Sequence, residues 1–237
     1  LGVQSTHDHH LHALGRVHVA AEAEHAITLA KAVVPRVSGD LIFGLTGQTE
    51  AEVERDLELY RRHDLSHASV YHLTYEPGTE FHAKLARGEA GEIAPERSRA
   101  LFALIHDRLA GLGLHAYETS NFARPGEESR HNLAYWQARD YHAAGAGAVS
   151  SLNRVRVTRE KHPAAYIAAI TAGRDATWKR ETIGDRELLR EAWMLGLRLS
   201  EGVAETRLDA LGDPASRWAT RAAALVQEGL IEHRDGR

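Results

Sequence analysis

The stretch Asp40-Leu41-Ile42-Phe43-Gly44-Leu45-Thr46-Gly47-Gln48-Thr49 decides the fold of this chain. The apolar residues between Val37 and Phe43 predict a buried strand, and the two glycines of the stretch predict a tight turn after it. Thr49, with Glu52 three residues later, is typical of the capping box that begins a helix. Asp40 is placed near the carboxyl end of the strand, where α/β barrels bind ligands. It is therefore a candidate binding residue; the alternative is a plain strand-to-helix turn with a solvated aspartate.

The composition is that of an ordinary globular protein. The chain has 237 residues, of which 43% are apolar and 26% charged, with a net charge of −4. This length suffices for one large domain or one and a half. The mild acidity gives no reason to expect nucleic acid or an anionic membrane as a partner. No apolar run is long enough to span a bilayer and no signal peptide is recognisable, so a cytoplasmic location is expected.

Cysteine is absent from the sequence. Disulfides and thiolate metal sites are therefore excluded within this chain. The chain begins at Leu1 without a methionine, and its first residues have the pattern of the end of a strand. We expect the natural protein to start further upstream.

Strands and helices are predicted to alternate through the first half of the chain. The predicted strands are residues 1–3, 37–43, 67–74 and about 114–119. The predicted helices, with apolar residues at helical spacing, are residues 19–34, 49–63 and 95–112. Strands separated by helices indicate a parallel sheet with crossover helices, and hence an α/β fold.

The alternation stops after Ser120. Residues 121–131 are predicted to be a polar loop, and residues 155–158 a short strand of a hairpin. From about residue 183 the pattern is helical, and Asp213-Pro214 is typical of a helix start. We expect residues 1–175 to belong to a barrel and residues 183–237 to a small helical domain of winged-helix type, with the boundary between residues 172 and 182.

Several short motifs occur along the chain in a fixed order. They are Gly2-Val3-Gln4-Ser5, Leu14-Gly15-Arg16-Val17-His18, Asp40-Leu41-Ile42-Phe43-Gly44-Leu45, Gly47-Gln48-Thr49, Glu76-Pro77-Gly78-Thr79, Ser120-Asn121-Phe122-Ala123 and Arg130-His131-Asn132-Leu133-Ala134-Tyr135-Trp136. Together they resemble the radical SAM family of oxygen-independent coproporphyrinogen III oxidase and its HemW haem-chaperone branch. The sequences at residues 75–78, Tyr-Glu-Pro-Gly, and at residues 130–136 are closer to HemW than to the oxidase.

The resemblance implies a partial TIM-type (β/α) radical SAM barrel that binds S-adenosylmethionine (SAM) beside a 4Fe–4S cluster. Gln4, Arg16 and Asp40 match family positions that contact SAM. The implied roles are chemically reasonable: Asp40 accepts hydrogen bonds from ribose hydroxyls, Arg16 pairs with the SAM carboxylate, and Gln4 donates and accepts. The alternative is that Arg16 is a surface ion-pair residue and Gln4 only caps a strand. No catalytic residue and no metal ligand is assigned.

The family holds its cluster with three cysteines on the loop after the first strand, and this chain has none. We therefore expect the cluster loop and the glycine-rich SAM segment to lie upstream of Leu1. By itself the chain is expected to bind no cluster and to be inactive in radical chemistry. Three positions also depart from the family: Thr46 replaces a proline, Ser129 a cysteine and Val149 a histidine. Valine can neither ligate haem iron nor bind a propionate, so haem contact through position 149 is not expected.

Histidines are frequent, and four of them crowd one predicted helix start: His7, His9, His10 and His12. His9 and His12 are three residues apart, so they could share a helix face and bind zinc. The alternative, which we favour, is that these are surface histidines without a metal. His131 lies in a matched motif and is either a functional imidazole or one that holds its loop in place.

The sequence therefore predicts a HemW-like radical SAM protein that acts as a haem chaperone. Its expected ligand is haem or a porphyrin, and its expected partner a haem-accepting protein. Two alternatives remain: an active coproporphyrinogen oxidase of porphyrin biosynthesis, and a non-catalytic binding module that uses the C-terminal helices. Cluster-dependent product formation distinguishes the first alternative, and lack of SAM binding the second.

Overall fold

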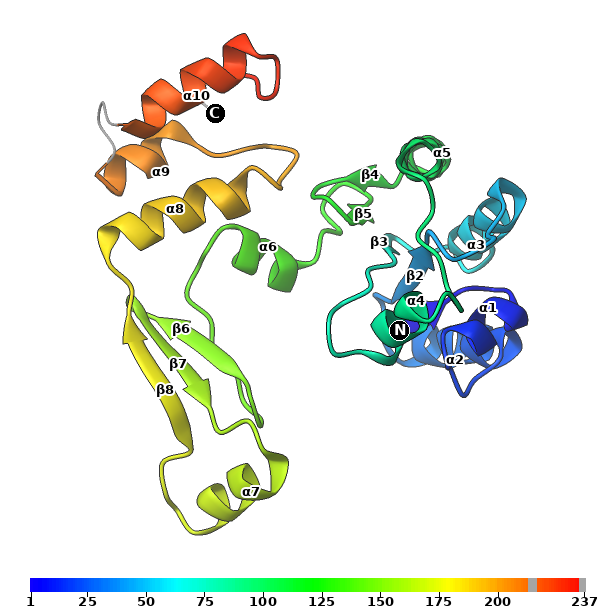
Figure 1. The fold of residues 1–237 in the computed structure, drawn as a ribbon, viewed down its shortest axis with the longest axis horizontal. Coiled ribbons are helices and arrows are strands. Elements are labelled where there is room, and N and C mark those ends of the chain that lie inside the picture. The colour runs from blue at the N-terminus through cyan, green and yellow to red at the C-terminus, as the bar shows by residue number, and fades with distance from the viewer. Residues whose placement is uncertain (213–216, 235–237) are drawn as a thin grey trace. The chain divides into compact units, whose positions relative to one another are not determined.

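The computed structural model describes residues 1–212 and 217–234. The chain divides into two compact units, Leu1–Glu128 and Ser129–Arg237 (Figure 1). Each unit has its own sheet, and the two are described separately below.

The first unit contains five strands and five helices. In chain order they are β1 (Gly2–Gln4), α1 (Asp8–Ala13), α2 (Ala20–Val33), β2 (Ser38–Phe43), α3 (Glu50–Arg62), β3 (His67–His72), α4 (Glu80–Ala86), α5 (Pro95–Gly111), β4 (His115–Ala116) and β5 (Asn121–Ala123). The strands form one sheet in the order β1-β2-β3-β5-β4. This mixed α/β architecture confirms the predicted fold class.

The stretch from residue 40 to residue 49 forms the predicted strand, turn and helix start, but Asp40 is the third of the six residues of β2 and does not lie near its carboxyl end as expected. β2 ends at Phe43, and α3 begins after Thr49 with a complete capping box. The Thr49 hydroxyl accepts a hydrogen bond from the Glu52 amide at 3.2 Å, and the Glu52 carboxylate accepts one from the Thr49 amide at 2.7 Å. Two otherwise unsatisfied amides of the helix start are thereby paired, which fixes where α3 begins.

The sheet is parallel only in part. β1 and β3 both run parallel to β2, as predicted, but β5 is antiparallel to β3 and to β4. The prediction of a polar loop over residues 121–131 is wrong at its start, because β5 lies between β3 and β4. Three residues are too few to show a strand period, and only their pairing with β3 makes them a strand. The chain also contains α4, which the sequence did not predict because it buries no residue.

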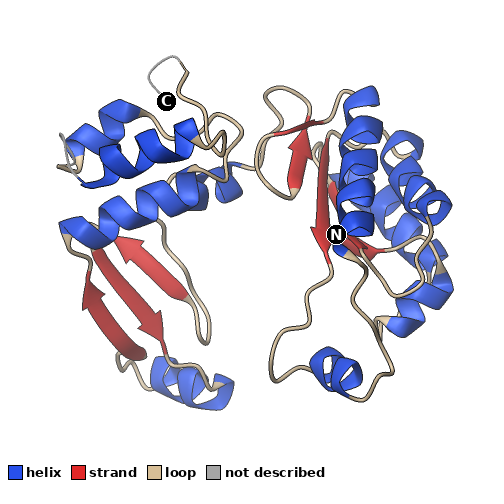
Figure 2. Cartoon of the chain, turned by 45° about the horizontal axis from the view of Figure 1, so that its top comes forward, coloured by secondary structure: helices blue, strands red, loops and turns tan. Residues whose placement is uncertain are grey.

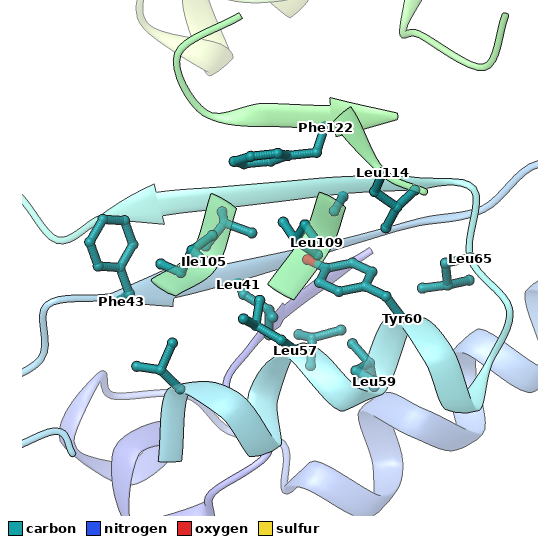
Figure 3. Packing of buried hydrophobic residues seen from close by; sticks show 14 of the residues in the cluster. Leu41, Phe43, Leu57, Leu59, Tyr60, Leu65, Ile105, Leu109, Leu114 and Phe122 are labelled. Carbon is teal, nitrogen blue, oxygen red and sulfur yellow. The ribbon is translucent and has the colours of Figure 1, made fainter. Parts of the chain in front are cut away.

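Helices α2, α3 and α5 share one hydrophobic core with the sheet (Figure 3). Its buried members are Val3, Ile27, Leu41, Phe43, Val53, Leu57, Leu59, Tyr60, Leu65, Ala68, Val70, Leu101, Ile105, Leu109, Leu114 and Phe122. The strand residues among them alternate along β2 and β3, since successive side chains of a strand point to opposite faces. All three helices therefore cover the same face of the sheet, as Figure 2 also shows for this unit.

The second unit consists of a three-stranded sheet and five helices among the described residues. Its elements are α6 (Arg130–Trp136), β6 (Val149–Leu152), β7 (Val155–Arg159), α7 (Pro163–Thr171), β8 (Thr177–Thr182), α8 (Asp185–Gly196), α9 (Glu205–Ala210) and α10 (Arg217–Gln227). The sheet is antiparallel in the order β6-β7-β8. The predicted hairpin strand is β7. Its turn has positive φ at both Asn153 and Arg154, as a two-residue hairpin of type I′ requires.

The predicted C-terminal helices are present as α8, α9 and α10. A small core between α8, α9 and the segment that joins them is formed by Leu189, Ala192, Val203 and Leu208. The helix start expected at Asp213-Pro214 lies outside the described residues. The segment in which a domain boundary was expected, residues 172–182, contains β8, which pairs with β7. The division into a barrel part and a winged-helix-like domain stays a prediction. Among the described helices, none has both the length and the apolarity needed to cross a membrane.

Candidate cofactor-binding site

The two faces of the first sheet differ in chemistry. The residues of β2 and β3 that do not enter the core are mostly polar, and the register pairs them across the two strands. Ser38 lies beside His67 and Asp40 beside Ser69. We call this surface, opposite the helices, the polar face. It carries the candidate residue Asp40.

Hydrogen bonds link most of the side chains on the polar face. The Ser38 hydroxyl lies 2.7 Å from Nδ1 of His67, and Nε2 of that ring lies 2.8 Å from the Tyr117 hydroxyl. A neutral imidazole has one donor and one acceptor nitrogen, so one hydroxyl donates to the ring and the other accepts from it. Burial lowers the pKa of His67, and the negative charge of Asp40 opposes this shift. The ring therefore favours its neutral form.

A second chain of hydrogen bonds runs along β3 and β5. The Ser69 hydroxyl donates to Oδ1 of Asn121 at 2.8 Å, and the amide of Asn121 donates to the Glu118 carboxylate. All three residues are buried. This chain orders the part of the polar face next to Asp40.

Asp40 itself stands apart from these chains. Its side chain is partly exposed, and its carboxylate makes no hydrogen bond or ion pair with any residue that the structure describes. Its backbone amide is occupied, because it donates to the carbonyl of Leu1 at 2.8 Å. A half-buried carboxylate without a partner is costly unless a ligand pairs with it.

Gln4 has an unusual backbone at the end of β1. Its φ is 69°, in the left-handed region that residues other than glycine rarely adopt, and the register with β2 shifts between Gly2 and Gln4. A Cβ on Gly2 would lie 2.7 Å from the Gln4 amide nitrogen, so the Gln4 side chain folds back over that glycine. Because Gly2 pairs with Asp40, the Gln4 amide is brought to the neighbourhood of Asp40. Strain of this kind is common at binding sites.

Arg16 lies between α1 and α2 and is exposed. Its backbone amide donates to the carbonyl of Leu11 at 2.9 Å, while its guanidinium has no partner among the described residues. The structure thus brings Gln4 and Asp40 to neighbouring strands and leaves Arg16 on a surface loop without the ion pair that the alternative interpretation required.

Sequence reasoning missed His67, Ser69 and Asn121 as members of this surface. A signal was present for two of them, since polar residues alternate with Ala68 and Val70 in β3. A strand whose alternate residues are polar has a second face of different chemistry. The position of Asn121 could not be found in this way, because only the strand pairing places it beside Ser69.

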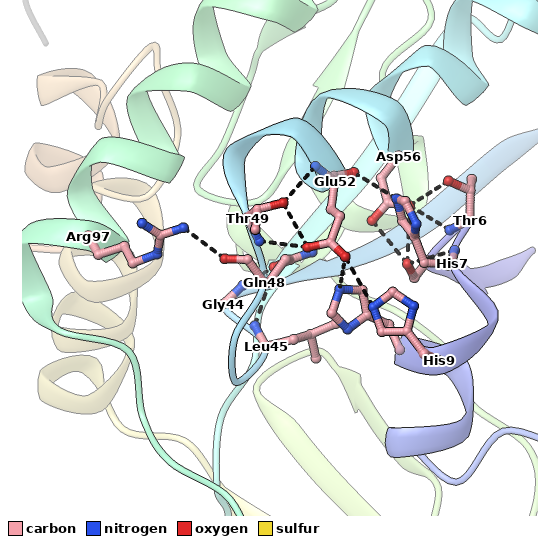
Figure 4. Close-up of polar contacts among 12 residues, drawn as sticks. Thr6, His7, His9, Gly44, Leu45, Gln48, Thr49, Glu52, Asp56 and Arg97 are labelled. Atoms are coloured by element: carbon pink, nitrogen blue, oxygen red, sulfur yellow. Dashed lines mark hydrogen bonds and ion pairs between the residues drawn. The ribbon is translucent and has the colours of Figure 1, made fainter.

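The loop that follows β2 is held by its own side chains. Oε1 of the buried Gln48 accepts hydrogen bonds from the amides of Gly44 and Leu45, at 2.9 and 3.3 Å (Figure 4). Gly44 has φ 81°, and a Cβ there would lie 2.9 Å from His72. Thr46, which stands at the position of a family proline, exchanges two hydrogen bonds with the backbone of Gly91. The Thr46 hydroxyl therefore holds this loop in place.

A second polar cluster follows β1 (Figure 4). The buried Asp56 carboxylate accepts hydrogen bonds from the Ser5 hydroxyl at 3.1 Å and from the amide and hydroxyl of Thr6 at 2.5 and 2.7 Å. Burial raises the pKa of Asp56, and these hydrogen bonds oppose the shift. Beside it, hydrogen bonds from Thr49 lower the pKa of Glu52 to about 2. This cluster fixes the loop that begins α1.

The free side chains fit SAM but not an iron–sulfur cluster. A carboxylate can accept from ribose hydroxyls, a guanidinium can pair with a carboxylate, and an amide can do both, so Asp40, Arg16 and Gln4 offer a complementary set. Iron–sulfur clusters are held by cysteine thiolates, and the sequence contains no cysteine. These residues therefore provide no ligand for a cluster.

The chain is similar in sequence to known haem chaperones. The chain is 33% identical to the haem chaperone HemW of Bacillus subtilis over 210 residues, which are 87% of the chain and 55% of that protein. It is 32% identical to HemW of Mycobacterium tuberculosis over 238 residues, which are 100% of the chain and 60% of that protein.

The chain is a relative of the HemW radical SAM proteins. Its fold also matches coproporphyrinogen III oxidase (HemN) from Escherichia coli, a radical SAM enzyme, with a TM-score of 0.77 and 16% identity over 99% of the chain and 58% of that protein. No protein-family model matches the chain. The chain spans a little more than half of the length of these relatives. The predicted resemblance to the HemW and HemN proteins is confirmed.

One of the HemW-like motifs lies in the second unit. The motif at 130–136 forms α6, where Ser129 caps the helix and accepts a hydrogen bond from Asn132. His131 is exposed, and its ring meets that of Tyr135 edge to face at 4.8 Å. Val149 begins β6 and pairs with Thr158. Neither His131 nor Val149 has contacts that assign it a role. The role of His131, like those of Gln4, Arg16 and Asp40, stays a prediction.

Proposed function

We propose that this chain supplies one wall of the SAM site in a HemW-type haem chaperone. The observation that supports it most directly is the carboxylate of Asp40 on the polar face, which has no partner among the described residues, with the amide of Gln4 folded over Gly2, the residue that pairs with Asp40. Similarity to HemW proteins over 87–100% of the chain identifies the class of protein. The 16% identity to the HemN structure supports only the fold, so HemW is the preferred branch over the oxidase.

Each candidate residue has a distinct task in this proposal. Asp40 accepts from the ribose hydroxyls of SAM, and its negative charge also attracts the positive sulfonium centre. The side-chain amide of Gln4 lies over Gly2, where it can donate to and accept from the ligand. Arg16 pairs with the carboxylate of SAM from its surface loop. When bound beside an iron–sulfur cluster, SAM supplies radical chemistry, and this chain offers the cluster no ligand.

Support for a ligand with carboxylates comes from a cleft within the second unit. The cleft has a volume of about 340 Å³ and is bordered by Trp136, Arg139 and Arg207, with Glu201 on its wall. Burial lowers the pKa of Arg207, and the positive charge of Arg139 lowers it further. Two guanidiniums near each other are stabilised by an anion between them. The propionates of haem are such anions, so we propose this cleft as the place where they bind.

The SAM part of the proposal is tested with Asp40→Asn. The variant is made in the protein encoded by the complete reading frame that contains this chain, and SAM binding is measured by calorimetry. Loss of a charge-assisted hydrogen bond costs about 1.5–3 kcal/mol, so SAM should bind roughly 10- to 100-fold more weakly. Asp107→Asn, at an exposed position of α5, is the control and should bind SAM normally. Equal affinities of the two variants would refute the role of Asp40.

The haem part is tested separately with the double variant Arg139→Gln and Arg207→Gln. Titration with haem, followed by absorbance, should show weaker binding than in the unchanged protein. The matched control is Arg174→Gln with Arg190→Gln, two exposed arginines of the same unit. If both double variants bind haem equally well, the cleft is not the propionate site. The haem-accepting partner and the cytoplasmic location stay predictions.

A further inference from the structure

Three histidines of the segment after β1 gather around Glu52. Nε2 of His9 lies 3.1 Å from Oε1 of Glu52, and Nε2 of His10 lies 3.5 Å from the same oxygen. Nε2 of His7 lies 3.3 Å from the backbone carbonyl of Glu52. The rings of His9 and His10 are 4.1 Å apart between centroids, and that of His7 is within 5.8 Å of both. Figure 4 shows His7 and His9 beside Glu52.

The two oxygens of the Glu52 carboxylate have different partners. Its Oε2 accepts hydrogen bonds from the amide and the hydroxyl of Thr49, at 2.7 and 2.8 Å, in the capping box of α3. These bonds fix the orientation of the group and leave Oε1 directed at the histidines. An oxygen held in place by its neighbour's hydrogen bonds is what a metal site requires of a carboxylate ligand.

The imidazoles are also prepared as ligands. If Nε2 of His7 donates to the carbonyl of Glu52, Nδ1 keeps the lone pair that a metal needs, and this is the usual way in which a backbone carbonyl orients a metal-bound histidine. A second observation concerns Nε2 of His10. The His10 side chain is only 6% exposed, and its Nε2 faces Oε1 of Glu52 at 3.5 Å, which is too long for a well-formed hydrogen bond. A cation bound to Glu52 would give this buried nitrogen a stronger partner.

We propose that His7, His9 and Glu52 bind a divalent transition-metal ion of the zinc class, with Nε2 of His10 beside the remaining position. One ligand atom from each of the first three residues lies within 4.8 Å of the other two. Ligand atoms about 2.0–2.1 Å from one zinc ion are about 3.3 Å apart in a tetrahedron. Nε2 of His9 and Oε1 of Glu52, at 3.1 Å, already have about this separation. The side chain of His9 is 63% exposed, so it can adjust without disturbing buried residues.

The neighbouring charges decide whether a cation is tolerated here. The positive end of the α3 helix dipole opposes it. Against this stand the carboxylates of Glu50 and Glu52 in the first turn of α3, Asp56 one turn further along, and Asp8 at the start of α1. Imidazole and carboxylate are ligands that zinc, nickel and copper prefer over calcium or magnesium. His12, which the sequence pairs with His9, is exposed and does not belong to this cluster.

The consequence for the fold is local. The metal would join the start of α1 to the start of α3. The candidate residues Gln4 and Arg16 lie just before and just after α1. The metal would stabilise the first unit in proportion to the free metal concentration, because the unfolded chain has no such preformed site. Neither SAM nor haem is needed for a metal ion to bind at these residues.

The test is calorimetry of the full chain with Zn²⁺, repeated with Co²⁺ followed by its visible absorption. We expect one Zn²⁺ per chain at this site and the intense visible band of tetrahedral Co²⁺. In the double variant His7→Ala with His9→Ala, Zn²⁺ should bind at least tenfold more weakly and the Co²⁺ band should be lost. Zn²⁺ should raise the melting temperature of the unchanged chain and not that of the variant.

The matched control is His12→Ala with His25→Ala, which removes two exposed histidines of the same unit. It should bind Zn²⁺ as the unchanged chain does. Glu52→Gln keeps an oxygen that can accept from Thr49 but removes the charge, and it should also weaken Zn²⁺ binding. If the His7/His9 variant binds Zn²⁺ as tightly as the unchanged chain, or the control loses as much affinity, the cluster is only a set of ion pairs and the proposal is wrong.

Discussion

The two faces of the first sheet are made from the same strands but have opposite properties. On the helix-covered face, Leu41 and Val70 are neighbours in register and both belong to the core. On the polar face, Asp40 and Ser69 are neighbours in register, and the carboxylate of Asp40 is without a partner. Successive side chains of a strand point to opposite faces. A side chain that packs in the core is therefore the direct neighbour in sequence of one that is free for a ligand.

The two faces therefore contribute differently to stability and to binding. Residues on the helix-covered face contribute to folding through apolar burial, at about 25 cal/mol per Å² removed from water. Residues on the polar face contribute little burial, and some of them, such as Gln4 with its left-handed backbone, cost stability. Substitutions on the first face should therefore change stability, and substitutions on the second should change binding.

The largest effect is expected on the helix-covered face, from Leu109→Ala. Leu109 is 0% exposed and packs in the core formed by α3, α5 and the sheet. Removing its side chain should lower the free energy of unfolding by about 3 kcal/mol, within the range of 2–5 kcal/mol for buried leucines. All four tryptophans lie after residue 129, so the first unit is best followed by hydrogen exchange of its own peptides in increasing urea.

The control for this prediction is Leu29→Ala. Leu29 lies on α2 and is 57% exposed, so the same chemical change should cost less than about 0.5 kcal/mol. If the two leucine variants lose equal stability, the core does not lie where α5 meets the sheet.

A smaller effect comes from pH and depends on His67 of the polar face. Burial lowers the pKa of His67 below its ordinary value of about 6.5. Below that pH the unfolded chain binds a proton that the folded chain does not, so stability is fully present above about pH 6.5 and is lost as the pH falls toward the folded pKa. The loss attributable to this residue should reach at most about 1.4 kcal/mol per pH unit.

The measurement is urea unfolding at several pH values between 5 and 8, for the unchanged chain and for His67→Gln. Glutamine can still donate and accept toward Ser38 and Tyr117 but does not titrate. The variant should lose less stability than the unchanged chain when the pH falls. Asp56 works in the opposite direction, because its raised pKa means that the folded chain binds its proton first, and it is unchanged in both proteins. Parallel pH curves would contradict a buried neutral His67.

Removing the cap of α3 should have an effect of about 1 kcal/mol. In Thr49→Ala, the amide of Glu52 loses the hydroxyl that it donates to at 3.2 Å, and the usual cost of losing such a cap is 0.5–2 kcal/mol. The matched substitution is Thr28→Ala on the exposed side of α2, where the hydroxyl only donates to the carbonyl of Glu24 within the helix. Urea unfolding followed by the same hydrogen exchange should separate the two, with Thr28→Ala close to the unchanged chain.

Much of the helix-covered face could be predicted from the sequence. The apolar spacing in Pro95–Gly111 and the capping box at Thr49 are local signals, and both elements lie within one or two residues of their predicted ends. The strand β5 could not be predicted, because Phe122 becomes part of a strand only by pairing with Ala68, more than fifty residues away. Local patterns contain no information about such a pairing.

The polar face and the histidine cluster were predictable only in part. Asp40 could be placed on a strand, although its expected position near the carboxyl end is wrong, because β2 continues for three residues after it. Its lack of a partner depends on what the neighbouring strands present. The sequence spacing of three favoured His9 with His12, as in a continuous helix. In the structure α1 begins only at Asp8 and has six residues, and Glu52, forty-three residues after His9, selects the histidines that gather. Tertiary contacts of this kind decide the site, and they are invisible in a window of sequence.

The smallest change in stability is expected for Asp40→Asn, on the polar face. The carboxylate makes no hydrogen bond or ion pair with the described residues, so an amide of the same shape removes no contact that holds the fold. Its negative charge favours the protonated form of His67, which contributes little above pH 7, where the ring is neutral. The free energy of unfolding should therefore change by less than about 0.5 kcal/mol at pH 7.5, although SAM binding by the complete protein should fall at least tenfold. A loss of more than 1 kcal/mol, measured by urea unfolding beside Asp107→Asn, would mean that Asp40 supports the sheet, and that the polar face is a structural layer in place of a binding surface.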